Sequence, residues 1–278
     1  MKILLVVGAR PQFIKASCIS REIKKHKNIK EIIVHTGQHY DNEMSQIFFD
    51  ELDISSPKYN LNVHELKHSS MISKMIIKLE KVVLKENPQW VLVFGDTNST
   101  LAGAIVANKL RINLAHIEAG MRSYNKKMPE ELNRIITDRL SNLLLCSSEL
   151  SKQNLISENY DKDNYKIVKV GDLMQDSILR NKKFEKKLSI KFKNNFILST
   201  IHRAENINNT EILKNIFEAL NYIGKSIQVI LPIHPHTLKK IKKLNIKIDK
   251  LKLINPVSYF EMIWLINKSR MLISDSGG

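Results

Sequence analysis

Cysteine is scarce in this chain of 278 residues, which contains only Cys18 and Cys146. The two cysteines lie far apart, and neither has a second cysteine at metal-binding spacing. This scarcity argues against a disulfide framework and against a zinc site made of cysteine pairs. Such usage is typical of proteins that work in a reducing compartment, so we expect a cytoplasmic location.

Long hydrophobic runs are also missing from the sequence. The first apolar run, Ile3–Val7, stops at Gly8 and Arg10, which is too short for a signal-peptide core or a membrane span. No later run approaches the length of a span. We therefore expect a soluble protein with no membrane partner.

Acidic residues are outnumbered, with 28 Asp and Glu against 44 Lys and Arg, which gives a formal net charge of +16. Such an excess can indicate a nucleic acid, a membrane surface or an acidic small molecule as partner. The lysines are scattered in short pairs, such as Lys24-Lys25 and Lys182-Lys183, without a recognised nucleic-acid-binding signature. We expect no nucleic-acid partner, and a polyanion-binding remnant stays as an alternative.

Short apolar runs rich in Ile, Val and Leu alternate with amphipathic stretches along the whole chain. The runs predict buried parallel strands at 2–7, 31–35, 90–94, 113–117, 142–146, 166–170, 195–200, 227–232, 251–254 and 271–274. Helical patterns fall at 12–26, 42–52, 66–86, 98–109, 129–141, 149–157, 208–224, 235–244 and 258–268. This alternation predicts an α/β fold with doubly wound parallel sheets.

The composition places a domain boundary after Gly171, because the segment 178–193 is rich in lysine and lacks long apolar stretches. We therefore predict an N-terminal domain at 1–171 and a C-terminal domain at 172–278. The last residues, Ser274-Asp275-Ser276-Gly277-Gly278, read as a strand that enters a phosphate loop. No helix follows that loop, so we expect the second domain to be incomplete.

Gly8, Arg10 and Pro11 follow the first predicted strand directly. A strand that ends in glycine and turns into a helix can present backbone N–H groups to an anion, and Arg10 adds a guanidinium. The spacing matches neither the dinucleotide fingerprint nor the P-loop. These residues also fit a plain strand-to-helix turn.

Two acids stand at the carboxyl ends of predicted strands, Asp96 after 90–94 and Glu118 after 113–117. Carboxylates at such ends can meet in one crevice and transfer protons there. The alternatives are structural: Asp96 as the N-cap of the next helix, and Glu118 paired with Arg122.

Three further candidates stand at strand or helix ends. Glu130 follows Pro129 in the first turn of a predicted helix, where it suits the helix dipole or a pair with Arg134. His202 and His234 each follow a strand, and His202 with Arg203 could lie beside a diphosphate. Two histidines at His234 and His236 without a further ligand are poor evidence for zinc.

Taken together, these segments resemble the non-hydrolysing UDP-N-acetylglucosamine 2-epimerase family. The matching stretches are GARPQFIK (8–15), HTGQHYD (35–41), GDTNSTLAGA (95–104), AHIEAGMRS (115–123), MPEELNRIITD (128–138), VGDLMQDS (170–177), HRAEN (202–206) and SDSGG (274–278). They run from end to end of the chain. The first and sixth stretches also resemble the branch that acts on UDP-2,3-diacetamido-2,3-dideoxy-glucuronic acid.

The resemblance implies two Rossmann-like domains in the glycosyltransferase-B arrangement, a UDP-sugar substrate and a homodimer. It implies elimination and re-addition of UDP through a 2-acetamidoglycal, with no metal or nicotinamide. The catalytic residues it implies are Asp96, Glu118, Glu130 and His202, and the substrate-binding residues are Arg10, Lys15, His234, Ser276 and Gly277.

Tyr40 and Asp41 depart from the family pattern, in which Arg-Glu or Arg-Gln stands in a loop that binds a regulatory UDP-sugar. Family members also continue past Ser-Asp-Ser-Gly-Gly, so we expect the chain alone to be poorly active or inactive. The alternatives are a hydrolysing epimerase and a glycosyltransferase of the same fold.

Overall fold

The computed structural model describes residues 1–38, 54–64, 67–160, 165–190, 192 and 195–275. These residues form two compact units, Met1–Ser177 and Ile178–Gly278. Along the chain, the division between the units falls within helix α7 (Leu173–Asn181). It lies a few residues after the boundary that the composition predicts at Gly171.

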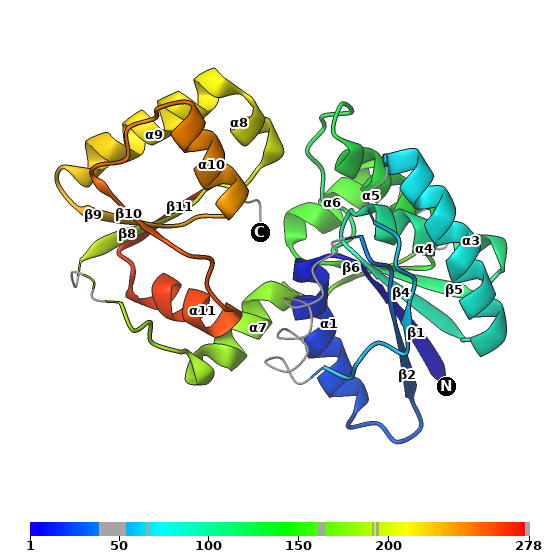
Figure 1. The fold of residues 1–278 in the computed structure, drawn as a ribbon. Coiled ribbons are helices and arrows are strands. Elements are labelled where there is room, and N and C mark those ends of the chain that lie inside the picture. The colour runs from blue at the N-terminus through cyan, green and yellow to red at the C-terminus, as the bar shows by residue number, and fades with distance from the viewer. Residues whose placement is uncertain (39–53, 65–66, 161–164, 191, 193–194, 276–278) are drawn as a thin grey trace. The chain divides into compact units, whose positions relative to one another are not determined.

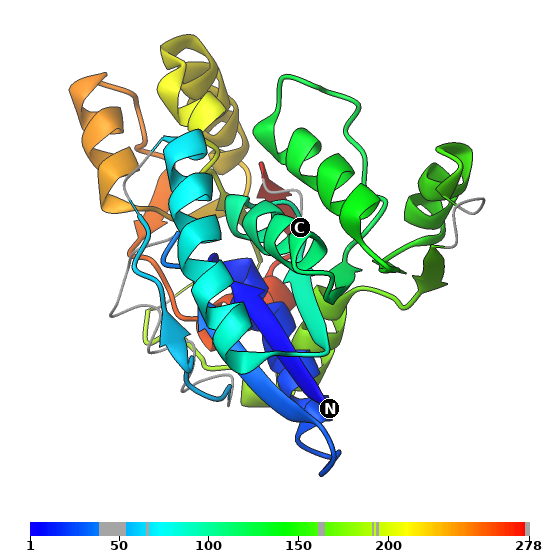
Figure 2. The same ribbon diagram turned by 90° about the vertical axis from the view of Figure 1, so that its right-hand side faces the viewer.

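The first unit is built on a parallel sheet of seven strands in the order β3-β2-β1-β4-β5-β6-β7 (Figure 1). The strands are β1 (Lys2–Val7), β2 (Lys30–His35), β3 (Tyr59–Asn60), β4 (Trp90–Phe94), β5 (Asn113–Ile117), β6 (Leu143–Cys146) and β7 (Lys166–Lys169). Its described helices include α1 (Arg10–Ile23), α3 (His68–Glu86), α4 (Asn98–Lys109), α5 (Pro129–Leu140) and α6 (Glu149–Ser157). Helix α1 covers one face of the sheet and α3 the other (Figures 1 and 2).

Strand β1 shows why the apolar runs are nearly continuous. Leu4 and Val6 belong to the core cluster that includes Leu79 of α3. Leu5 and Val7, which point to the other face of the sheet, are also fully buried. A strand covered on both faces needs apolar side chains at every position.

The strand order of the first unit reverses between β1 and β4, which are neighbours in the sheet but not in the chain. In doubly wound sheets, ligands bind in the crevice outside the carboxyl ends of the strands at such a reversal. Here the loop that starts at Gly8 and the turn at Gly95 and Asp96 border that point.

The second unit carries a parallel sheet of four described strands in the order β10-β9-β8-β11. Its elements, after a short 3-10 turn (Lys182–Phe184), are β8 (Phe196–Thr200), α8 (Ala204–Asn208), α9 (Thr210–Gly224), β9 (Gln228–Pro232), α10 (Pro235–Lys243), β10 (Leu251–Ile254), α11 (Tyr259–Lys268) and β11 (Met271–Ser274). The order reverses between β8 and β11, so His202 and Asp275 flank this reversal.

The predicted α/β class with two doubly wound parallel sheets is confirmed. The sequence patterns did not predict the short strand β3 or the helices α7 and α8. The predicted helix at 42–52 lies outside the described residues. Among the residues that are described, no helix has both the length and the apolar character to cross a bilayer.

Candidate active site

The turn between β1 and α1 is closed by the side chain of Gln12, which is buried. Its Oε1 accepts from the backbone N–H groups of Gly8 at 2.7 Å and Ala9 at 3.1 Å. Its Nε2 donates to the carbonyl oxygen of Phe94 at 2.7 Å. The N–H groups of Gly8 and Ala9 are therefore used by Gln12, which joins this turn to the end of β4.

Arg10, the first residue of α1, is exposed. Lys15, one turn further along the same helix, is buried and reaches Glu118 at the end of β5. The ammonium Nζ of Lys15 contacts Oε2 of Glu118 in an ion pair whose side chains are 10% and 17% exposed. Partly buried pairs are screened less by salt than surface pairs, so this contact holds the Glu118 carboxylate in place.

The backbone at Glu118 is left-handed, with φ of 69°. A non-glycine residue in this region is uncommon, and such residues often lie at functional sites. Gly95 is also left-handed, with φ of 63°, and a Cβ atom there would stand 3.2 Å from Oε2 of Glu118. The end of β5 and the turn after β4 therefore hold the Glu118 carboxylate directly beside the residue that precedes Asp96.

Asp96 pairs with Arg134 of α5 through Oδ2 and Nη2. Arg134 also lies 3.2 Å from Oε2 of the buried Glu131. The helix cap that the sequence offered for Asp96 belongs instead to Thr97, whose hydroxyl accepts from the backbone N–H of Thr100. Asp96 therefore does not cap the helix, and its side chain is 35% exposed.

Glu131 holds the loop before α5 in place. Its carboxylate accepts hydrogen bonds from the backbone N–H groups of Ser123 and Tyr124 and from the Ser123 hydroxyl. Burial alone would raise the pKa of Glu131, but these hydrogen bonds and Arg134 together lower it. Glu130 is exposed in the first turn of α5. The expected pair between Glu130 and Arg134 is not the one observed, because Asp96 and Glu131 take the guanidinium.

The expected pair between Glu118 and Arg122 is also replaced. Arg122 lies 2.7 Å from Oδ2 of Asp138 and donates two hydrogen bonds to Glu158, at 2.7 and 2.8 Å. Asp138 in turn contacts the imidazole of His116 at 2.6 Å. These contacts form one hydrogen-bonded cluster of His116, Asp138, Arg122 and Glu158, and sequence spacing alone gave no signal for it.

In the second unit, Asp275 after β11 holds the loop after β8. Its carboxylate accepts from the backbone N–H groups of His202 and Arg203 and from the side-chain amide of Asn206, at 3.0–3.1 Å. Burial alone would raise the pKa of Asp275, but these hydrogen bonds lower it. The imidazole Nδ1 of His202 lies 3.3 Å from Oδ1 of Asp275, and its side chain is 60% exposed.

His234 is exposed between β9 and α10. Ser276 and Gly277, the predicted phosphate-binding residues, lie outside the described residues. The structure thus brings Asp96, Glu118 and Lys15 together in the first unit, with Glu130 on the adjoining helix α5. His202 and His234 stand at strand ends of the second unit. Asp275, which pairs with His202, was not predicted as a site residue from the sequence.

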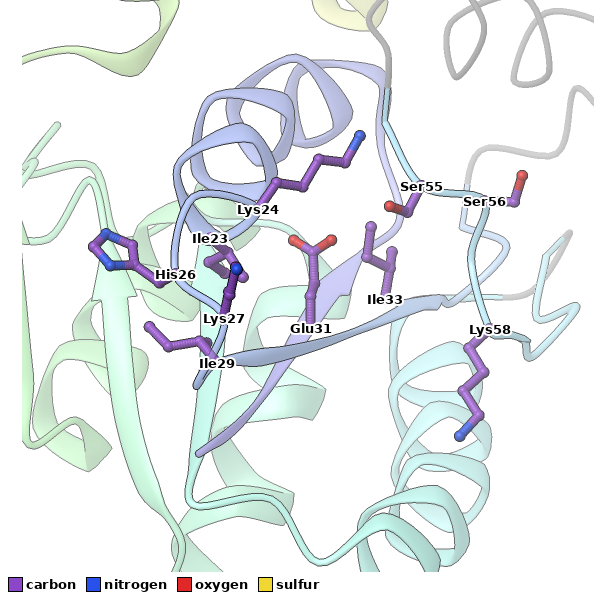
Figure 3. A pocket seen from close by; sticks show the side chains of 10 residues that line it. All are labelled: Ile23, Lys24, His26, Lys27, Ile29, Glu31, Ile33, Ser55, Ser56 and Lys58. Atoms are coloured by element: carbon purple, nitrogen blue, oxygen red, sulfur yellow. The ribbon is translucent and has the colours of Figure 1, made fainter.

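A hollow of about 270 Å³ lies elsewhere, around the amino end of β2 (Figure 3). None of the predicted site residues lines it. Glu31 stands at its centre, while His26 and Lys58 point away from the Glu31 carboxylate. Within the described ranges, no three His, Cys, Asp or Glu side chains are grouped so as to hold a metal ion.

Comparison with known proteins adds to this geometry. A family model described as UDP-N-acetylglucosamine 2-epimerase matches residues 21–278. The chain is 49% identical to the UDP-2,3-diacetamido-2,3-dideoxy-D-glucuronate 2-epimerase of Pseudomonas aeruginosa and 43% identical to the UDP-N-acetylglucosamine 2-epimerase of Methanocaldococcus jannaschii. Each match covers 100% of this chain and 79% of the relative.

Solved structures of such proteins share the fold. The crystal structure of the Methanocaldococcus jannaschii enzyme in complex with UDP-GlcNAc and UDP matches with a TM-score of 0.88 and 42% identity, covering 100% of this chain and 79% of that one. The Neisseria meningitidis enzyme bound to UDP-GlcNAc matches with a TM-score of 0.88 and 32% identity, covering 100% and 78%. The chain belongs to the UDP-N-acetylglucosamine 2-epimerase family.

Proposed function

We propose that this chain is a non-hydrolysing UDP-sugar 2-epimerase that interconverts UDP-N-acetylglucosamine and UDP-N-acetylmannosamine. One observation carries the proposal: the Glu118 carboxylate lies beside Gly95, the residue before Asp96, and each of the two acids pairs with its own cation. Carboxylates can accept a proton as general bases, and Lys15 and Arg134 hold these two in position.

The proposed reaction is an elimination followed by an addition. A carboxylate removes the proton from C2, the C1–O bond to the diphosphate breaks, and its electron pair leaves with UDP. The electrons of the C2–H bond form the C1–C2 double bond of a 2-acetamidoglycal. Reprotonation of C2 on the opposite face, with return of the UDP oxygen to C1, gives the epimer.

We assign the proton transfers to Asp96, Glu118 and Glu130 as a group. Glu130 suits the exposed side of the site, since it stands in the first turn of α5, the helix that carries Arg134. Departure of an anionic diphosphate is assisted by cations and N–H donors at the leaving oxygens. We assign that role to Arg10 and His202.

Lys15, His234, Ser276 and Gly277 complete the proposed substrate-binding set. Lys15 would act through Glu118, which it contacts. His234 follows a strand of the second unit, as His202 does. We further propose a homodimer in the cytoplasm, which fits the scarcity of cysteine.

A second candidate substrate is UDP-2,3-diacetamido-2,3-dideoxy-glucuronate. It is favoured by the 49% identity to the Pseudomonas aeruginosa relative that is named for it. The chemistry at C1 and C2 is the same for both sugars, so the two candidates share every step above.

The chain covers 79% of its relatives, so the test uses a version that is extended beyond Gly278 to their length. This version is incubated with each UDP-sugar in D2O, and the products are examined by proton NMR. We expect deuterium at C2 of the recovered UDP-sugar and appearance of its C2 epimer. Release of free sugar would indicate hydrolysis instead, and no exchange with either substrate would contradict the proposal.

Glu118→Gln and Glu149→Gln form a matched pair for this experiment. Glu149 is an exposed carboxylate that pairs with Lys169 at 3.1 Å and is not one of the proposed site residues. We expect E118Q to slow exchange by at least about 100-fold, the usual size of a lost proton-transfer group, and E149Q to leave it unchanged.

A further inference from the structure

His116 is a fully buried histidine on β5, two residues before Glu118. Both of its ring nitrogens have a partner: Nδ1 lies 2.6 Å from Oδ1 of Asp138, and Nε2 lies 2.7 Å from the carbonyl oxygen of Gly95. Because the ring has no exposed surface, it cannot touch a substrate. Its contribution must come through the groups that it holds.

The partners fix where the protons are. A backbone carbonyl only accepts hydrogen bonds, so Nε2 carries a proton. Asp138 accepts through Oδ2 from Arg122 at 2.7 Å and from the backbone N–H of Gly120 at 3.2 Å. With Oδ2 accepting from these donors, the Asp138 carboxylate also serves as the acceptor at Oδ1, which places a donor at Nδ1 of the ring.

Donors and acceptors alternate around the ring. His116 and Arg122 donate to Asp138 and Glu158, and each contact within the cluster is 2.6–2.8 Å long. Buried polar groups are tolerated when they are hydrogen-bonded in this way. A ring that donates from both nitrogens is therefore matched by acceptors inside the unit.

The ring connects the three segments that bear the proposed carboxylates. Its Nε2 holds the Gly95 carbonyl, directly before Asp96. Its own strand continues into Glu118, and its Nδ1 holds Asp138 on α5, the helix that begins with Glu130. The two left-handed turns at Gly95 and Glu118 face each other across this contact.

We propose that His116 is a positioning residue, a doubly protonated imidazole that fixes the turn of Gly95 and Asp96 against Glu118 and α5. The proposal deepens the epimerase function and rests on it for its kinetic consequence. Removing the hydrogen bond to Gly95 would release the Asp96 turn. A shift of about 1 Å at reacting groups can cost about 100-fold in rate.

Two substitutions separate the two contacts. The amide nitrogen of Gln reaches the place of the imidazole Nε2, so His116→Gln keeps a donor for Gly95 and gives up the contact with Asp138. The amide nitrogen of Asn takes the place of Nδ1, so His116→Asn keeps Asp138 and leaves Gly95 without its donor. His26→Gln and His26→Asn are the matched controls, because His26 is an exposed histidine whose side chain is 54% exposed.

Exchange at C2 is then measured for all four variants of the extended chain, together with KM and thermal unfolding. We expect H116Q to stay within about tenfold of the wild-type rate and H116N to lose at least about 100-fold in kcat with KM changed less than about threefold. The His26 variants should match the wild type. Equal rates in H116Q and H116N, or losses that only follow their unfolding temperatures, would overturn the proposal.

A measurement that needs no enzymatic turnover tests the proposal about His116 independently of the proposed function. In nitrogen-15 NMR of the full chain at neutral pH, the His116 signals, assigned by their loss in H116Q, should show an attached proton on both ring nitrogens. A ring with one proton would overturn the proposal even if the chain epimerises a UDP-sugar. An extended wild-type chain without C2 exchange would instead contradict the proposed function and leave this spectrum as the test of His116.

Discussion

The backbone of Gly8 passes close to two hydroxyl groups at the end of the sheet. A Cβ atom at this position would stand 2.1 Å from Oγ of Ser99 and 2.2 Å from Oγ1 of Thr36. The two hydroxyls are themselves hydrogen-bonded to each other at 2.8 Å, and both residues are fully buried. The glycine is required here by lack of space, since its φ lies outside the left-handed region.

We expect Gly8→Ala to destabilise the first unit by about 1–3 kcal/mol, the usual cost of forcing atoms into a packed interior. Chemical denaturation measures this loss. Part of it should return in G8A/S99A, because that background removes one of the two hydroxyls. Gly171 is the complementary control. A Cβ atom there would meet no other atom, but its φ is 89°, so G171A tests backbone strain without a steric clash. A G8A chain as stable as the wild type would show that the close contacts do not exist.

Single residues also show what sequence reasoning can and cannot reach at the site. Asp96 and Glu118 were predicted from their places at strand ends, which the topology then brings together. The structural alternatives, a helix cap for Asp96 and a pair with Arg122 for Glu118, are not observed, because they considered only neighbours along the chain. Lys15 pairs with Glu118 across 103 residues, and only the folded sheet creates such a contact.

At the scale of elements, the last residue of helix α3, Glu86, bonds to the neighbouring strands. The carboxylate of Glu86 accepts from Nζ of Lys58 and from the hydroxyl of Tyr59, the latter at 2.6 Å. The Glu86 carbonyl accepts from Nζ of Lys2 at 2.7 Å. An acid at a helix C-terminus opposes the helix dipole, so these contacts hold α3, β3 and β1 together against that penalty.

A pH dependence follows from the Glu86 contacts. The hydrogen bond from Lys58, helped by Tyr59, lowers the pKa of Glu86 from 4.5 to about 2. Between these values the unfolded chain binds more protons at this residue than the folded chain, so its contribution to stability is lost as the pH falls. Above about pH 4.5 that contribution is fully present.

We therefore expect wild type to be more stable than Glu86→Gln above pH 4.5, with a difference that shrinks as the pH approaches 2. Denaturation midpoints across this range measure it. Glu80→Gln, at an exposed position of α3, controls for the loss of one negative charge. A difference between E86Q and wild type that stays constant down to pH 2 would contradict the assigned pKa.

Elements were predictable where the apolar pattern was strong. Strands buried on both faces, such as β1 and β4, were found from their runs of Ile, Val and Leu. Strand β3 has two residues and carries no periodic signal. Helix α7 was missed because its turns cross the boundary between units, where Leu179 is 65% exposed and the apolar stripe is incomplete.

At the scale of the molecule, the two units repeat one plan. Each has a parallel sheet whose strand order reverses once among the described strands, and each places polar groups at that reversal. In the first unit these are the paired carboxylates, and in the second they are His202 and Asp275. The proposed function assigns acid–base groups to the first reversal, for the sugar, and anion-binding groups to the second, for the nucleotide.

The hydrophobic clusters of the described residues likewise stay within one unit each. The main cluster of the first unit includes Leu79 of α3, and a cluster of the second includes Phe217 of α9, both fully buried. We expect Leu79→Ala and Phe217→Ala each to cost about 3 kcal/mol through lost contacts and the cavity left behind. Because the clusters share no residues, each variant should lower one of two calorimetric transitions and leave the other in place. A single transition lowered equally by both variants would show that the units unfold together, and the energetic independence inferred from their separate cores would be wrong.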